Sequence, residues 1–277
     1  MPIIGWIFLA LFLGVVFVKY ALGLVIISES QVGVLVKKIG KPLPNDRFVA
    51  VNGEAGYQAE TLAPGWHFWL WSFMYDVFKQ PITIIKEGEI GLVLARDGAQ
   101  IPAHRILGEV VECNNFQDAT QFLKNGGEKG RQLGLLTAGV YRINSSLFEV
   151  ITTANIEQKN LSGITVEFLR MTQIKSDFVG LVTVLDGKPL IEGRIAGTSI
   201  PNHSSFQDGM AFIKNGGFKG LQEDVLRPGS YTINPWFAKI EQIPMTEIDI
   251  GYVGVVVSSS GDSDEDVSGA DFTHSNL

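Results

Sequence analysis

The chain has 277 residues and a formal net charge of −7, and its only cysteine is Cys113. The negative charge argues against nucleic acid as the main partner of the protein. A single cysteine excludes an intrachain disulfide and any zinc site built from several cysteines, which fits a reducing compartment. The length is sufficient for one large or two small domains, each with its own hydrophobic core.

The first segment of the chain, residues 3–27, is apolar except for Lys19. A helix of this length would measure roughly 37 Å and could cross a hydrocarbon core of about 30 Å. The sequence therefore predicts a transmembrane helix over 3–27. Lys37, Lys38 and Lys41 follow it and favour the cytoplasmic side for the rest of the chain. We expect a single-pass protein of the cell membrane (inner or plasma membrane) with its folded part in the cytoplasm.

Two other interpretations of residues 3–27 stay open. A cleaved secretory signal would need a basic start and a cleavage site of small residues. Residues 21–23 could serve as that site, but Met1 and Pro2 offer no basic side chain. A buried core helix is the other interpretation, although such helices are usually shorter and amphipathic.

The sequence after this segment repeats itself. Residues 116–127 return as residues 206–217, a separation of 90 positions, and the similarity extends to 138–144 and 228–234. A shorter copy of the last part occurs at 62–70. Such self-similarity is typical of duplicated structural units.

Each unit is expected to open with a β-branched strand that contains a glycine. The predicted strands are 32–36, 90–94, 179–183 and 253–257. The pairs Asp97-Gly98 and Asp186-Gly187 predict hairpin turns after the middle two strands.

The repeated segment 116–127 predicts a short helix with one apolar face. Asn115 and Ser205 are the expected N-cap residues, and Gly126 and Gly216 are expected to end the helices in the left-handed conformation. The predicted fold class is therefore α+β, with an N-terminal transmembrane helix followed by repeated strand–hairpin–helix–strand modules.

This pattern divides the chain into four predicted segments. The transmembrane helix at 3–27 is followed by a first module at 28–150 and a second, duplicated module at 151–250. A third module begins at 251 and is truncated at 277, where the chain ends in an acidic stretch.

The order of these elements resembles the start of a band 7 or SPFH family protein, the group that includes stomatin, prohibitin, flotillin and the HflK and HflC proteins. The motif that carries most of the resemblance is Pro64-Gly65-Trp66-His67-Phe68, a tight turn that enters an aromatic strand. The resemblance covers residues 1 to about 260, and the duplication is most similar to extended, flotillin-like bacterial members. Trp71 stands where many relatives have a proline, and no C-terminal coiled coil follows.

This resemblance implies a protein that is not an enzyme. Its members are membrane-anchored scaffolds that oligomerise into rings or cages and organise membrane microdomains. The implied partners are the lipid bilayer, further copies of the chain and, in some members, a membrane protease. Two alternatives stay open: a regulator that binds and sequesters a membrane protease, and a secreted or periplasmic binding module with a cleaved signal.

No catalytic or metal-binding pattern stands out, and no cofactor is expected. The four histidines, at 67, 104, 203 and 274, lack the spacing of a zinc motif. Asp262, Asp264 and Asp266 have the rhythm of a calcium loop, but Thr273 stands where the bidentate acid would be. We interpret these aspartates as a solvated acidic loop.

The candidate site is an aromatic cluster that begins at Trp66. Trp and Tyr side chains favour the membrane–water interface. The candidate membrane-interface residues are therefore Trp66, Trp69, Trp71 and Tyr75. Strand alternation over 66–71 would make both faces apolar, so a strand buried on both sides is the competing interpretation.

Overall fold

The computed structural model describes residues 6–9, 11–14, 17, 22–44, 46–159 and 163–257. Strands account for 34% of the chain and helices for 12%. The predicted α+β class is therefore wrong, and the fold is mainly β with several small sheets. The repeated helices, α2 (Ala119–Lys124) and α4 (Gly209–Lys214), have only six residues each. They are short because an aspartate N-cap and an asparagine C-cap lie so close together in the sequence.

The predicted transmembrane helix over 3–27 also needs correction. Within the described ranges, the structure has no helix that combines the length and the apolar character needed to cross a bilayer. The end of the predicted span is a strand, β1 (Val25–Ile27), which pairs antiparallel with β5 (Gly65–His67). Three consecutive β-branched residues favour that strand. The location as a single-pass protein of the cell membrane is therefore not supported; residues 1–5, 10, 15–16 and 18–21 lie outside the described residues.

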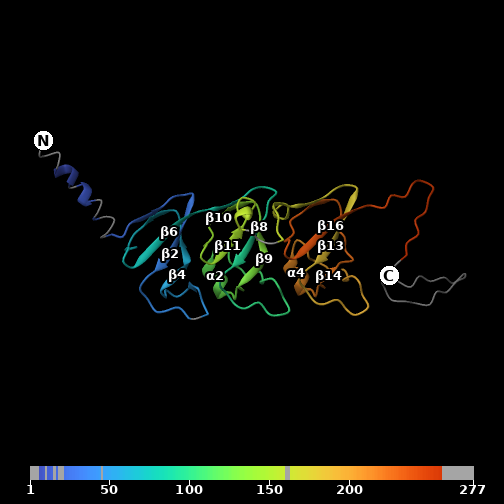
Figure 1. Cartoon of the computed structure of the whole chain (residues 1–277), viewed down its shortest axis with the longest axis horizontal. Coiled ribbons are helices and arrows are strands. Elements are labelled where there is room, and N and C mark those ends of the chain that lie inside the picture. The colour runs from blue at the N-terminus through green and yellow to red at the C-terminus, as the bar shows by residue number, and fades with distance from the viewer. Residues whose placement is uncertain are drawn as a thin grey trace. The chain divides into compact units, whose positions relative to one another are not determined.

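The chain divides into two compact units, residues 1–170 and 171–277. The first unit contains two groups of strands, which we call module A (25–81) and module B (83–170). Figure 1 labels the principal strands of both. In module A the sheet order is β3-β4-β2-β6. Its strands are β2 (Gln31–Lys37), β3 (Val49–Ala50), β4 (Gly56–Leu62) and β6 (Tyr75–Pro81).

Module B has a three-stranded sheet in the order β11-β8-β9 and a separate ribbon of β7 and β10. Helix α2 lies between β8 and β9 in the chain, and α3 and the 3-10 helix η1 follow β11. The bounds are β7 (Thr83–Ile85), β8 (Gly91–Ala95), β9 (Gly130–Leu136), β10 (Gly139–Tyr141), β11 (Phe148–Ile151), α3 (Ile156–Lys159) and η1 (Val166–Leu169).

The second unit contains module C (172–244), which repeats the topology of module B. Its sheet order is β14-β13-β16, its ribbon joins β12 and β15, and α4 lies between β13 and β14 in the chain. The bounds are β12 (Thr172–Ile174), β13 (Phe178–Val184), β14 (Gly220–Leu221), β15 (Gly229–Tyr231) and β16 (Ala238–Pro244).

A buried glutamine recurs at the same place in all three modules. Gln132 donates its side-chain amide to the carbonyls of Glu128 (2.7 Å) and Gly130 (2.9 Å). Gln58 and Gln222 make the equivalent two bonds in modules A and C. Because a buried amide needs partners, each glutamine fixes the bend that leads into its strand. The three modules are therefore built on one local plan.

Three aromatic rings form the centre of module B. The ring of Phe148 lies edge-on to two other rings. The centroid of Phe148 is 4.8 Å from that of Phe122 and 5.4 Å from that of Phe116. All three rings are buried, and they belong to a cluster that also includes Val49 and Ala59 of module A. Modules A and B therefore share one hydrophobic core.

The entry to helix α2 differs from the prediction. Asn114, Asn115 and Phe116 all have left-handed backbone conformations, with φ of 50°, 51° and 62°. Asn115 is therefore not the N-cap. That role belongs to Asp118, whose carboxylate accepts the N–H of Gln121 at 2.8 Å. Module C repeats this turn, with Asp208 as its cap.

Candidate functional site

The junction between modules A and B depends on a buried carboxylate. One oxygen of Asp97 accepts the backbone N–H groups of Phe48 (2.7 Å) and Val49 (2.8 Å), at the start of β3. The other oxygen accepts the N–H of Gly98 at 2.8 Å. Asp97 is only 3% exposed, so water does not compete strongly for these bonds. The turn after β8 therefore holds the backbone of the preceding module.

A buried amide completes the junction. The side chain of Asn144 donates to the carbonyls of Gln58 and Ala59, both at 2.9 Å. Its own oxygen accepts the N–H of Ser146 at 3.0 Å, which fixes the orientation of the amide. Asp97 and Asn144 thus bind two neighbouring strands of module A through backbone atoms only. Such contacts depend on strand geometry and tolerate different side chains.

The same two residue types recur in module C. Asp186 follows β13 as Asp97 follows β8, and it is 2% exposed. Asn234 is 4% exposed, and its side-chain oxygen accepts the N–H of Trp236 at 2.9 Å. The Asp-Gly pairs predict turns only, and do not by themselves predict contact with a neighbouring module. Their repetition, together with that of the Ile-Asn pairs, was the signal for the junction residues.

A groove of about 800 Å³ lies beside this junction within the first unit. Residues of β2 and β4 line one side, and the loop before α2 and the helix itself line the other. Two of its polar groups serve the local fold, because Asp118 caps α2 and Gln117 accepts the N–H of Arg142 at 3.0 Å. The lining includes Leu35, Ala50, Gln58, Glu60, Thr61, Asn114, Gln117, Asp118, Thr120 and Lys124.

The predicted aromatic site lies on the surface of module A. Trp66 is on β5 and is 68% exposed, and Trp69 is 60% exposed. Trp71 and Tyr75 are half-buried, with Tyr75 at the start of β6. None of the four is buried, so the interpretation of a strand enclosed on both faces is wrong. Their contact with a membrane interface stays a prediction.

The aromatic residues are brought together by a turn. The strand β5 ends at His67, and Trp69 has a left-handed backbone with φ of 67°. The ring of Trp71 lies edge-on to that of Trp69 at 5.8 Å and stacks on that of Phe73 at 5.9 Å. The structure therefore unites Trp69, Trp71 and Phe73 in one cluster, which the assumed strand alternation did not predict.

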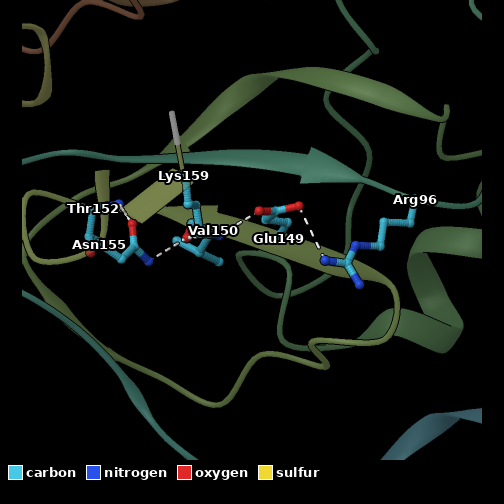
Figure 2. Close-up of polar contacts among 6 residues, drawn as sticks. All are labelled: Arg96, Glu149, Val150, Thr152, Asn155 and Lys159. Carbon is cyan, nitrogen blue, oxygen red and sulfur yellow. Dashed lines mark hydrogen bonds and ion pairs between the residues drawn. The ribbon is translucent and has the colours of Figure 1, made fainter. Parts of the chain in front are cut away.

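A chain of ion pairs supports the last strand of module B. Figure 2 shows Glu149 between two cations: Lys159 binds one carboxylate oxygen at 2.7 Å, and Arg96 binds the other at 3.2 Å. The hydrogen bond from Lys159, and to a lesser degree that from Arg96, lowers the pKa of Glu149 although partial burial opposes this. Asn155 accepts the N–H of Thr152 and donates to the carbonyl of Val150 beside this pair (Figure 2). The cluster fixes α3 to β11.

Cys113 has the properties of a structural thiol. Burial raises the pKa of its thiol above the ordinary value, and a hydrogen bond from the Phe116 N–H lowers it only in part. A raised pKa reduces the thiolate fraction that a nucleophile needs. In module C the equivalent group is His203, whose Nδ1 accepts the N–H of Phe206 at 2.8 Å. Both side chains therefore serve the left-handed turn before the helix.

The remaining candidate residues are a histidine with a structural role and three aspartates that lie outside the described residues. The ring of His67 makes a hydrogen bond of 2.7 Å with the carbonyl of Ala63, which closes the turn before β5. Among the described residues, no group of three or more His, Cys, Asp or Glu side chains could hold a metal ion. Asp262, Asp264 and Asp266 lie outside the described residues.

Comparisons with protein-family models, with curated proteins and with solved structures found no match to the chain.

Proposed function

We propose that the chain is a non-catalytic scaffold that associates with further copies of itself through its repeated β modules. The proposal follows the resemblance to SPFH scaffolds but needs no transmembrane helix. The observation that carries it is the junction of modules A and B. There, Asp97 and Asn144 bind only the backbone of the neighbouring module.

This type of junction suits a protein built by repetition. In repeat proteins, each unit is stabilised by contacts with its neighbours. The junction of module A with module B adds a shared hydrophobic core to the backbone bonds. A module whose junction face is not covered by a neighbour could therefore bind another module through the same backbone bonds and hydrophobic contacts. We infer that assembly from such contacts is the main activity of the chain.

The test is the molecular mass of the full chain in solution and its appearance in electron micrographs. We expect particles that contain several copies at micromolar concentration. A chain that remains a single copy at every concentration would contradict the proposal. An Asp97→Ala variant serves as a comparison, because it weakens the internal junction and leaves the exposed surfaces unchanged.

A further inference from the structure

The left-handed turn of module C depends on a histidine ring in its neutral form. Nδ1 of His203 accepts the N–H of Phe206 at 2.8 Å, so this nitrogen carries no proton and the ring proton is on Nε2. The backbone carbonyl of His203 also accepts the N–H of Asp208, the cap of α4, at 3.1 Å. His203 therefore supports the turn at two points before the helix begins.

The backbone of this turn is strained. Ser204, Ser205 and Phe206 all have left-handed conformations, with φ of 49°, 54° and 64°. Residues other than glycine seldom adopt this conformation, and it persists only where the surrounding contacts impose it. Loss of the Nδ1 acceptor therefore removes one of the contacts that maintain the turn.

A proton on the histidine ring would introduce a charge into an aromatic core. His203 is 7% exposed, and the centroid of its ring lies 4.4 Å from that of Phe206 and 5.4 Å from that of Phe212. A buried charge without a partner is unfavourable. A protonated ring also carries N–H groups on both nitrogens, so Nδ1 can no longer accept the Phe206 N–H. Both effects oppose the folded turn when the ring is charged.

The charged groups around the ring offer it no opposite charge. Among the ion pairs of the described residues, none joins His203 to a carboxylate within 4.0 Å. The carboxylate of Asp208 binds the N–H of Ala211 at 2.9 Å, and β13 contains no charged residue. The other charged side chains of α4 and β16 are exposed: Lys214, Lys239 and Glu241.

The turn is connected to the main sheet of module C through aromatic rings. The ring of Phe212, on α4, lies edge-on to that of Phe237, with centroids 5.7 Å apart. The carbonyl of Phe237 accepts the N–H of Leu185, directly after β13, at 2.7 Å. A change in the turn therefore reaches the packing of α4 on the sheet.

Module B has the same turn with a different side chain beneath it. Cys113 accepts the N–H of Phe116, and burial raises the pKa of its thiol above the ordinary value of 9.0. The thiol therefore stays neutral between about pH 5 and 8, the range in which histidine side chains change their charge. Of these two supporting side chains, only that of module C gains a charge in mild acid.

We propose that His203 makes the turn and helix α4 of module C a proton-sensitive element, which opens when mild acid protonates the ring. The opened segment takes up a proton that the folded turn excludes, so opening becomes more favourable as the pH falls. One proton changes the opening constant by up to about tenfold per pH unit. This response belongs to module C alone and does not depend on the scaffold function.

The experiment measures amide hydrogen exchange of the full chain at about pH 5 and about pH 7.5, corrected for the intrinsic exchange rates. Segment 206–217 reports on module C, and the matched segment 116–127 reports on module B. We expect acid to reduce the protection of 206–217 about tenfold or more and to leave 116–127 unchanged. His203→Cys, which copies module B, and His203→Asn, which offers an amide oxygen as acceptor, should both abolish this acid effect.

Several outcomes overturn the proposal. These are equal protection of 206–217 at both pH values, an equal loss in 116–127, or the same acid effect in both variants. A titration of the His203 ring by NMR in the original chain makes the test independent of whether the variants fold. A ring that stays neutral at about pH 5, or that gains its proton while the turn stays closed, also contradicts the proposal.

Discussion

The carboxylate of Asp97 binds the backbone N–H of Val49 at 2.8 Å, although the two residues are 48 positions apart in the sequence. This bond joins module B to module A, and the carboxylate also binds the N–H of Phe48. Because these are backbone contacts, the junction can be repeated wherever a module presents the same two strands. The stability of the first unit should therefore depend strongly on this side chain.

We expect Asp97→Ala to destabilise the first unit by about 2–4 kcal/mol, since it removes the acceptor of three backbone N–H groups: a buried one on Val49 and partly buried ones on Phe48 and Gly98. Urea unfolding followed by tryptophan fluorescence measures the change. Asp76→Ala is the matched control. It removes a half-exposed carboxylate that is paired with Lys38, and such surface pairs are worth about 0–1 kcal/mol. Equal effects of the two substitutions would contradict the assigned role of Asp97.

A second prediction concerns the acceptor beneath the left-handed turn of module C. His203→Ala removes the acceptor of the Phe206 N–H. It should lower the free energy of unfolding by about 1–3 kcal/mol, because this N–H is buried. His203→Cys should lower the free energy of unfolding less than His203→Ala, since Cys113 accepts the equivalent N–H in module B. Thermal unfolding of the two variants provides the comparison. If the alanine variant is as stable as the cysteine variant, the hydrogen bond is not what maintains the turn.

The third prediction is a pH dependence that arises from Glu149. Its pKa is lower in the folded chain than its ordinary value of 4.5, so the unfolded state binds more protons in the range just below that value. The stabilisation is complete at higher pH and is lost as the pH falls through 4.5 towards the folded pKa. Glu149→Gln should remove this part of the acid sensitivity.

Unfolding free energies measured across this pH range test the assignment. Lys159→Met removes the larger cause of the pKa shift and should also flatten the profile. A Glu149→Gln variant whose stability falls with acid as steeply as that of the original chain would show that other carboxylates cause the loss.

The fourth prediction tests the aromatic cluster of module A. If Trp66 and Trp69 contact a membrane interface, Trp66→Ala/Trp69→Ala should reduce sedimentation of the chain with lipid vesicles several-fold. Phe78→Ala is the control, because it removes another exposed ring, on β6. Unchanged vesicle binding with an intact fold would remove the membrane interpretation of these residues.

The sequence predicted the local features that depend on neighbouring residues. The strands at 32–36, 90–94 and 179–183 are confirmed by β2, β8 and β13, because β-branched residues favour strands wherever a partner exists. Gly126 and Gly216 are confirmed as left-handed residues after their helices, with φ of 78° and 91°. The repetition of the chain was also evident, since it needs no knowledge of distant contacts.

Features that depend on distant parts of the chain were missed. Asn144 binds carbonyls 85 and 86 positions away; its repetition as Asn234 marks the residue, but no sequence pattern identifies those partners. The aromatic strand over 66–71 was wrong because Trp69 adopts a left-handed conformation that side chains seldom take. The predicted transmembrane helix over 3–27 was wrong: residues 6–9, 11–14 and 17 are helical, but hydropathy alone cannot reveal that Val25–Ile27 form a strand with β5.

The most direct test of the central claim is sedimentation equilibrium of the full chain over a range of concentrations. A single chain has a mass of 30.3 kDa. The scaffold function requires a mass that rises with concentration to a multiple of this value. A mass that stays at 30.3 kDa throughout would show that the modules do not bind further copies, and would contradict the proposed function.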